Sequence, residues 1–253
     1  MYNLVVGCMF RNESDSIVEW IEHYLARGVD HLYLINDDSD DDSVEKLGPY
    51  LEKDVVTVFH ATWGRYLGRQ RDMYNHYLLS IIDDSKWWLI VDMDEYMWCP
   101  PDINMYRYLE GMCSRLAQIQ VDHTIFGSSG YIEQPKEGIV KSFLHRSSEI
   151  KTQNPGNSKY FIQTRFGFTS LNVHHASFKN KEDEKERFMK LNETYFRLNH
   201  YNCQSREFWS RVKCTRGDSD AYRQRSMEEF EYLDQNDVLD TDLRDQLEKK
   251  TDG

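Results

Sequence analysis

Apolar residues fall in short runs and at helical spacing in turn along the first part of the chain. The short runs predict buried strands, and stretches in which apolar residues recur every three or four positions predict amphipathic helices. The predicted strands cover residues 4–9, 31–35, 55–60 and 87–91, and the predicted helices cover residues 17–28 and 69–82, with a further helical stretch before residue 55. Strands that alternate with helices predict a mostly parallel sheet with helices on its faces.

The first predicted helix has candidate boundaries at both ends. Asn12 or Ser14 is the candidate N-cap, because a short polar side chain can accept a hydrogen bond from a free backbone N–H. Gly28 is the candidate stop, because glycine takes the left-handed conformation that ends many helices. The loop before this helix therefore follows the first strand directly.

Beyond about Pro100 the pattern loosens. Further strands are predicted at residues 117–125, 139–145, 159–163 and 195–200, joined by loops rich in Gly, Ser, Asn and Lys. We read them as a second half, with a smaller sheet, of one α/β domain that covers residues 1–225 and divides near residue 100. Residues 226–253 form an acidic tail with apolar positions at helical spacing. We expect this tail to be a helix or linker that leads toward a further domain in a longer native chain.

Charge and composition narrow the classes of partner. The net charge of -12 and the pI near 5.2 exclude wide surfaces for nucleic acid or anionic membranes, so any phosphate contact must be a local pocket. No run of about eighteen apolar residues predicts a membrane span, and the N-terminus lacks the basic region of a secretory signal. Five cysteines without a CxxC pair fit reduced thiols, so we expect a cytoplasmic protein.

Polar clusters follow three of the predicted strands, at residues 11–13, 36–42 and 92–94. Ligands of open α/β sheets bind beyond the carboxyl ends of the strands, so these clusters should converge. Asp92 and Asp94 stand one residue apart at the end of an apolar strand, and both can turn toward one hard cation, Mn²⁺ or Mg²⁺. Without a cation the two carboxylates should repel each other.

An ordered series of motifs gives the chain a family resemblance. The motifs, in chain order, are VVGCMFRNE, HLYLINDDSDDDS, GRQRD, WWLIVDMDEY, FGSSG, NVHHASF and NHYNCQSREF. On these motifs the chain resembles glycosyltransferases of families 2 and 92, whose GT-A fold is a nested α/β sheet, over roughly residues 3 to 217. The anchor-free form also resembles virus-encoded enzymes of this type, from algal viruses, that glycosylate capsid protein in the host cytoplasm.

The resemblance implies the partners and the residues of the site. The first half would bind a nucleotide-sugar donor, preferably a UDP-sugar, and the second half would bind a glycan or glycoprotein acceptor. Asp92, Asp94 and His200 would hold the cation, with His174 and His175 as the other candidate histidines. The residues implied to contact the nucleotide, diphosphate or donor sugar are Arg11, Asn12, Glu13, Asn36, Asp38, Arg69, Arg71, Asp92 and Met93. Gln204 departs from the pattern, because relatives often carry lysine there, so a phosphate contact is missing or relocated.

The resemblance also implies that the configuration of the sugar is inverted. One side chain must then take the proton from the acceptor hydroxyl while the cation neutralises the leaving diphosphate. Asp122 and Glu133, on either side of the FGSSG motif, are the candidates, and no motif distinguishes them.

Several of these residues also fit a structural role. Asn12 fits a helix cap, residues 40–42 fit a solvated loop with caps, and Arg69 and Arg71 fit the surface of a helix. Only one of the adjacent His174 and His175 can face a site from a strand.

Two other functions fit parts of the same pattern. A sugar nucleotidyltransferase would use a similar sheet and cation, but it needs a glycine-rich, lysine-bearing phosphate loop that is missing near the N-terminus. A carbohydrate-binding module without catalysis would bind a free glycan and would need no nucleotide. Glycosyl transfer is the interpretation that the whole series of motifs favours.

Overall fold

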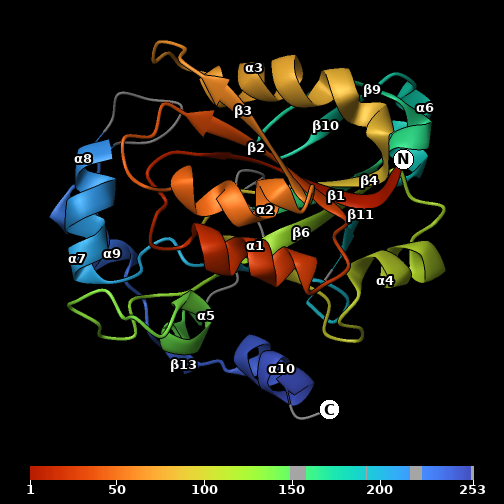
Figure 1. The fold of residues 1–253 in the computed structure, drawn as a ribbon. Coiled ribbons are helices and arrows are strands. Elements are labelled where there is room, and N and C mark those ends of the chain that lie inside the picture. Colours follow the sequence, from red (N-terminus) through yellow and green to blue (C-terminus); the bar gives the residue numbers. More distant parts are fainter. Residues whose placement is uncertain (149–157, 192, 217–223, 252–253) are drawn as a thin grey trace.

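A computed structural model describes residues 1–148, 158–191, 193–216 and 224–251 of the chain. Its centre is a curled nine-stranded sheet in the order β3-β2-β1-β4-β8-β6-β12-β5, with β11 paired to β6. Figure 1 shows helices α1 and α2 on one side of this sheet and α3 on the other. The predicted α/β class, a mostly parallel sheet flanked by helices, is confirmed.

The four strands predicted in the first half all form, and they pair in parallel. They are β1 (Tyr2–Phe10), β2 (His31–Asp37), β3 (Val56–Ala61) and β4 (Ser85–Ile90). Alternate residues of β1 enter different cores: Leu4 and Val6 pack with helix α1 (Ile17–Leu25), and Val5 packs with the helical segment 69–84. Each fully buried side chain of this size contributes about 1.5–3 kcal/mol, so burial on both faces fixes the register of the sheet.

The predicted helix over residues 69–82 is also confirmed, although it changes its winding along its length. It consists of α3 (Arg69–Met73), a π-helical turn η2 (Tyr74–Leu78) and a 3-10 segment η3 (Leu79–Asp84). The helical stretch before β3 comprises η1 (Glu45–Leu47) and α2 (Gly48–Glu52).

The second half extends the same sheet. The antiparallel strand β8 joins β4 to β6, and β12 then lies between β6 and β5. The strands are β5 (Glu95–Trp98), β6 (Gln118–Ile125), β8 (Ser158–Gln163), β11 (Phe188–Leu191) and β12 (Arg197–His200). Two small sheets pair β9 (Phe168–Leu171) with β10 (Ala176–Phe178), and β7 (His145–Arg146) with β13 (Val238–Leu239).

The remaining helical segments belong to the second half of the chain and to the tail. They are α4 (Met105–Met112), α5 (Ile139–Ser142), η4 (Thr164–Phe166), α6 (Lys181–Glu186), α7 (Arg206–Phe208), η5 (Trp209–Lys213), α8 (Cys214–Arg216), α9 (Met227–Leu233) and α10 (Asp242–Thr251). None of the described helices is long and apolar enough to cross a membrane.

Two local predictions are wrong. Residues 139–145 were predicted as a strand, but they begin with helix α5, whose first N–H groups are bound by the carboxylate of Glu19. Neither Asn12 nor Ser14 caps α1, because Ser16 precedes the helix and Asn12 has a positive φ of 53°. Asn12 instead exchanges hydrogen bonds with Asp40 in the neighbouring loop.

The acidic tail packs against the body of the molecule. Helix α9 begins with a capping box formed by Ser226 and Glu229, and its Phe230 packs on Trp209. Further along, Asp240 forms ion pairs with Arg146 and Arg197.

Candidate functional site

A cavity of about 390 Å³ lies where strands β1, β2 and β4 end. Its walls include Arg11 and Glu13 after β1, Asp37 at the end of β2, and Asp92 and Asp94 after β4. The three polar clusters therefore converge as predicted. Parallel strands that end together place their loops at one edge of the sheet, which explains this arrangement.

Asp92 is held by two side chains from other parts of the chain. Its carboxylate accepts hydrogen bonds of 2.7 Å from Lys159 Nζ and 2.8 Å from Gln70 Nε2. Lys159 is fully buried on β8 and also lies 3.6 Å from Glu95. Burial alone would lower the pKa of Lys159, but the carboxylates of Asp92 and Glu95 raise it above its ordinary value, so the lysine is charged.

Asp94 has its own cationic partners. Its Oδ2 lies 2.7 Å from Lys213 Nζ, and its Oδ1 lies 3.4 Å from His200 Nε2. Burial opposes ionisation of Asp94, but Lys213 and His200 hold its pKa well below the usual range. The expectation that Asp92 and Asp94 repel each other without a cation is therefore wrong, since a different lysine ammonium neutralises each of them.

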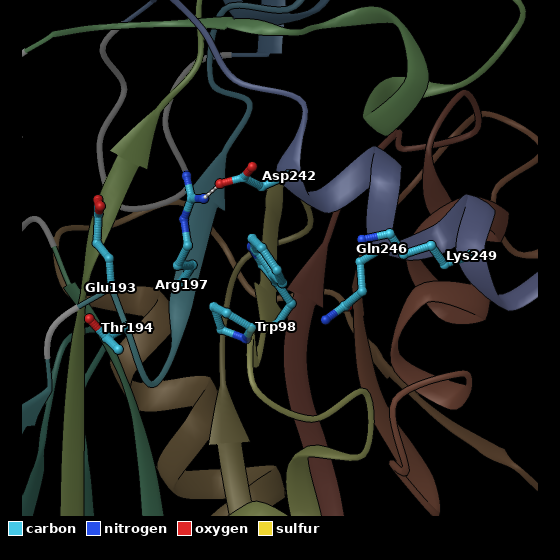
Figure 2. A pocket seen from close by; sticks show the side chains of 8 residues that line it. Trp98, Glu193, Thr194, Arg197, Asp242, Gln246 and Lys249 are labelled. Atoms are coloured by element: carbon cyan, nitrogen blue, oxygen red, sulfur yellow. Dashed lines mark hydrogen bonds and ion pairs between the residues drawn. The ribbon is translucent and has the colours of Figure 1, made fainter.

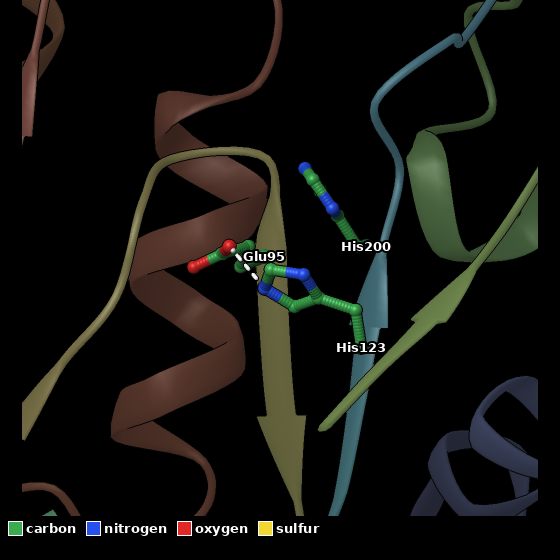
Figure 3. Close-up of side chains that lie close together, drawn as sticks. All are labelled: Glu95, His123 and His200. Carbon is green, nitrogen blue, oxygen red and sulfur yellow. Dashed lines mark ion pairs between the residues drawn. The ribbon is translucent and has the colours of Figure 1, made fainter. Parts of the chain in front are cut away.

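A group of possible metal ligands lies beside Asp92 and Asp94 (Figure 3). Side-chain ligand atoms of Glu95, His123 and His200 all lie within 4.8 Å of one another. Glu95 is already engaged, because Oε1 lies 2.7 Å from His123 Nε2 and Oε2 accepts a hydrogen bond from the backbone N–H of Asp92. His200 differs, because its Nδ1 is buried without a hydrogen-bond partner among the described residues.

The three residues predicted to hold the cation can be compared with this group. Asp92, Asp94 and His200 line the cavity, whereas Glu95 and His123 do not. Carboxylate oxygens suit Mn²⁺ and Mg²⁺, and an imidazole nitrogen is an accepted further ligand. All three predicted ligands therefore line the cavity, but among the described residues the ligand atoms that lie within 4.8 Å of one another are those of Glu95, His123 and His200.

The residues implied to contact the nucleotide divide into two groups. Arg11, Glu13, Arg69, Asp92 and Met93 line the cavity. The others that were implied, Asn12, Asn36, Asp38 and Arg71, are not among its lining residues.

The side chains of the second group lie outside the cavity lining. Asn36 is buried, and its Nδ2 lies 3.2 Å from His60 Nδ1. Asp38 is exposed and has a positive φ of 55°, and Arg71 is exposed and pairs with Asp72. To contact a ligand in the cavity, these side chains would have to move, or the ligand would have to project out of the cavity toward them.

Arg69 has a buried partner that sequence reasoning missed. Its guanidinium donates two hydrogen bonds, of 2.6 and 2.5 Å, to the carboxylate of Asp37. Arg11 donates a bond of 3.3 Å to the backbone carbonyl of Asp37. Asp37 therefore links two of the arginines that line the cavity.

Cationic side chains outnumber carboxylates in the cavity lining. Six cationic side chains line it, against four carboxylates, although the whole chain carries a net charge of -12. The six are Arg11, Arg65, Arg69, Lys213, Arg216 and Arg225. Lys213 and Arg216 lie on the helical segment 206–216, and no motif noted in the sequence identified them.

Gln204, which stands where relatives often carry lysine, does not line the cavity. It is fully buried and accepts a hydrogen bond from Gln134. Lys213 is the lysine that reaches the cavity from the same region, which fits a relocated phosphate contact.

The two candidate bases lie away from the cavity lining. Asp122 on β6 lies 2.7 Å from Lys190 on β11. Glu133 is exposed in the loop after the FGSSG motif. Neither carboxylate is among the residues that line the cavity, so neither is placed by this structure where a donor would react.

The adjacent histidines differ in exposure, although they lie in the turn between β9 and β10 and not on a strand. His174 lines the cavity, and its Nδ1 lies 3.0 Å from the carbonyl oxygen of Ser158. His175 is exposed and is not among the lining residues.

A second cavity, of about 530 Å³, lies at the opposite ends of β5 and β12 (Figure 2). Arg197 pairs there with Asp242 and lies over the ring of Trp98, while Gln246 and Lys249 of α10 form another wall. Its charges are mixed, and it is separated from the first cavity by the length of the two strands.

Comparisons with known proteins agree on one family. The model of the family described as glycosyltransferase family 92 matches residues 5–246. A glycosyltransferase family 92 protein of Ricinus communis is 26% identical over 215 residues, covering 80% of this chain and 35% of the relative. A family 92 protein of Arabidopsis thaliana is 24% identical, covering 80% and 36%. The chain thus spans about a third of the length of these relatives.

Among solved structures, S. aureus TarS 1-349 in complex with UDP-GlcNAc is similar with a TM-score of 0.47. It is 13% identical, and the match covers 91% of this chain and 64% of that one.

Proposed function

Because the chain belongs to glycosyltransferase family 92, we propose that it transfers a sugar from a nucleotide diphosphate donor, a UDP-sugar, to a hydroxyl of a glycan or glycoprotein. Family membership supports glycosyl transfer, and the donor, the acceptor, the inversion of configuration and the use of a cation are our proposals. A cytoplasmic location and a viral source remain predictions.

The observation that carries this proposal is the cluster of cations beside two carboxylates at the end of a buried strand. A strongly acidic protein repels phosphates unless cationic side chains are gathered locally, as they are around this cavity. A nucleoside diphosphate leaving group needs its charge neutralised, and Lys213, Arg216 and Arg225 offer that from one wall. Arg11 and Glu13, which follow β1 and contact Arg216, fit the nucleoside.

Asp94 and His200, with Asp92 beside them, would hold the divalent cation, Mn²⁺ or Mg²⁺. When bound, the cation would supply electrostatic stabilisation of the diphosphate as it leaves. Lys213 must then give up its contact with Asp94, and its ammonium becomes available to a phosphate oxygen.

Asn36 and Asp38 would face the uracil base or the ribose, and Arg71 the diphosphate or the donor sugar, once the donor is bound. Asn12 supports this region through the neighbouring loop, because its side chain bonds Asp40. Arg69 acts through Asp37, which it holds with two hydrogen bonds.

Calorimetry of nucleotide binding tests the proposal. UDP should bind more tightly than GDP, and its affinity should rise when Mn²⁺ is added, because a cation held by Asp92 and Asp94 would neutralise charge on the diphosphate. Uridine should bind weakly and should not respond to Mn²⁺, since it has no phosphate. Binding of a free glycan without any response to UDP would instead indicate a carbohydrate-binding module.

A further inference from the structure

Each of the four carboxylates that line the cavity is already paired with a cation. Asp37 pairs with Arg69, and Glu13 pairs with Arg216. Asp92 pairs with Lys159. Asp94 pairs with Lys213, beside His200. A carboxylate that took the proton of the acceptor hydroxyl would have to give up its ion pair, so none of the four is free to act as the general base.

His174 is different, because its ring presents a nitrogen that is free to accept a proton. A carbonyl oxygen only accepts hydrogen bonds, so the 3.0 Å contact with the oxygen of Ser158 requires the proton of the neutral ring on Nδ1. The lone pair is then on Nε2. Nε2 has no hydrogen-bond partner among the described residues, and it is not buried. It is therefore open to the cavity that His174 lines.

We propose that His174 is the general base of the transfer reaction, a role that rests on the proposed function. The acceptor hydroxyl oxygen forms a bond to the anomeric carbon of the donor sugar, and the bond from that carbon to the diphosphate oxygen breaks. The bonding electron pair leaves with the nucleoside diphosphate, and the hydroxyl proton passes to Nε2 of His174. The carbonyl of Ser158 holds the ring in the tautomer that this step needs.

The charges around His174 favour its neutral form. Burial lowers its pKa and the ammonium of Lys159 lowers it further, while the bond to the Ser158 carbonyl and the more distant Asp92 and Glu95 oppose this effect. The pKa is therefore below the ordinary value for histidine. Nε2 is unprotonated at neutral pH, and the rate should fall only in acid, as pH drops through this lowered pKa.

The test compares wild type with His174→Asn and with His175→Asn, a matched change at the exposed neighbour. UDP release from UDP-glucose, UDP-galactose and UDP-N-acetylglucosamine is followed from about pH 5 to about pH 9, and UDP affinity is measured by calorimetry. Asparagine retains a donor for the Ser158 carbonyl but offers no basic nitrogen. We expect kcat to fall about 100-fold or more with UDP affinity unchanged, and the decline in acid to disappear.

His174→Ala provides a second measurement, because added imidazole should restore part of its rate. A merely structural histidine would show neither this rescue nor the change in pH profile. A His174→Asn protein with the wild-type kcat and pH profile would overturn the role of His174 alone. A wild type that binds no UDP and turns over none of the three donors would instead remove the proposed function, and the role of His174 with it.

Discussion

At the scale of single residues, the sequence predicts which groups meet but not what neutralises them. Asp92, Asp94 and His200 lie at one cavity as expected, because strand ends and ordered motifs placed them there. The lysines that pair with the two carboxylates were missed, since they lie 67 and 119 residues further along the chain. Long-range ion pairs leave no local pattern, so only the folded chain shows that the acidic pair is already compensated.

Changing Asp94 to Asn should abolish the rise in UDP affinity that Mn²⁺ causes, because an amide is a weak ligand for a hard cation. The apo protein should also lose about 1–3 kcal/mol of unfolding free energy, because Lys213 loses its carboxylate partner in a nearly buried position. Calorimetry and urea unfolding measure the two effects.

Asp83→Asn is the control for this change, since Asp83 is exposed and far from the lining residues. It should leave both quantities at their wild-type values. If Asp94→Asn kept the full response to Mn²⁺, the cation would be held elsewhere, with Glu95 and His123 as the next ligands to change.

At the scale of elements, local patterns predict strands well and fail where an element depends on a distant partner. The four strands of the first half were predicted because each is a compact apolar run; β1, β2 and β4 are buried on both faces of the sheet, and β3 is a partly buried edge strand. Residues 139–145 contain β-branched and aromatic side chains typical of strands, yet the segment starts as a helix. Glu19 of α1 supplies the capping carboxylate from more than a hundred positions away, which no local signal reveals.

Replacing Glu19 with alanine should destabilise the protein by about 1–2 kcal/mol, because two backbone N–H groups at the start of α5 lose their acceptor. Urea unfolding at neutral pH measures the loss, and Glu52→Ala, an exposed glutamate of α2, is the matched control. Equal stability of the two variants would mean that the cap contributes nothing to α5.

At the scale of the whole molecule, the tail was predicted as a helical appendage to a domain that ends near residue 225. The first helix of the tail, α9, forms where expected. None of the described tail residues lines the cavity of about 390 Å³. The tail nevertheless adds a strand beside β7 and supplies carboxylates to arginines of the body. These contacts depend on side chains separated by long stretches of sequence, so composition alone indicated only an acidic helix.

Asp240→Asn tests how firmly the tail is joined to the body. The side chains of Asp240 and Arg197 are only 6% and 7% exposed. When the negative charge of Asp240 is removed, the nearly buried guanidinium of Arg197 keeps its ion pair with the more exposed Asp242. Breaking such a pair costs about 3 kcal/mol. For a protein of this size, that loss corresponds to a fall of roughly 6–12 °C in the melting temperature.

UDP affinity should be unchanged in this variant, because Arg197 lies at the opposite end of β12 from His200. Asp83→Asn again serves as the control for loss of a single exposed charge. A wild-type melting temperature for Asp240→Asn would show that the tail adds little to the stability of the body, as an appended segment would. None of the described tail residues lines the cavity of about 390 Å³. A lowered melting temperature together with weakened UDP binding would therefore mean that the two ends of β12 are coupled.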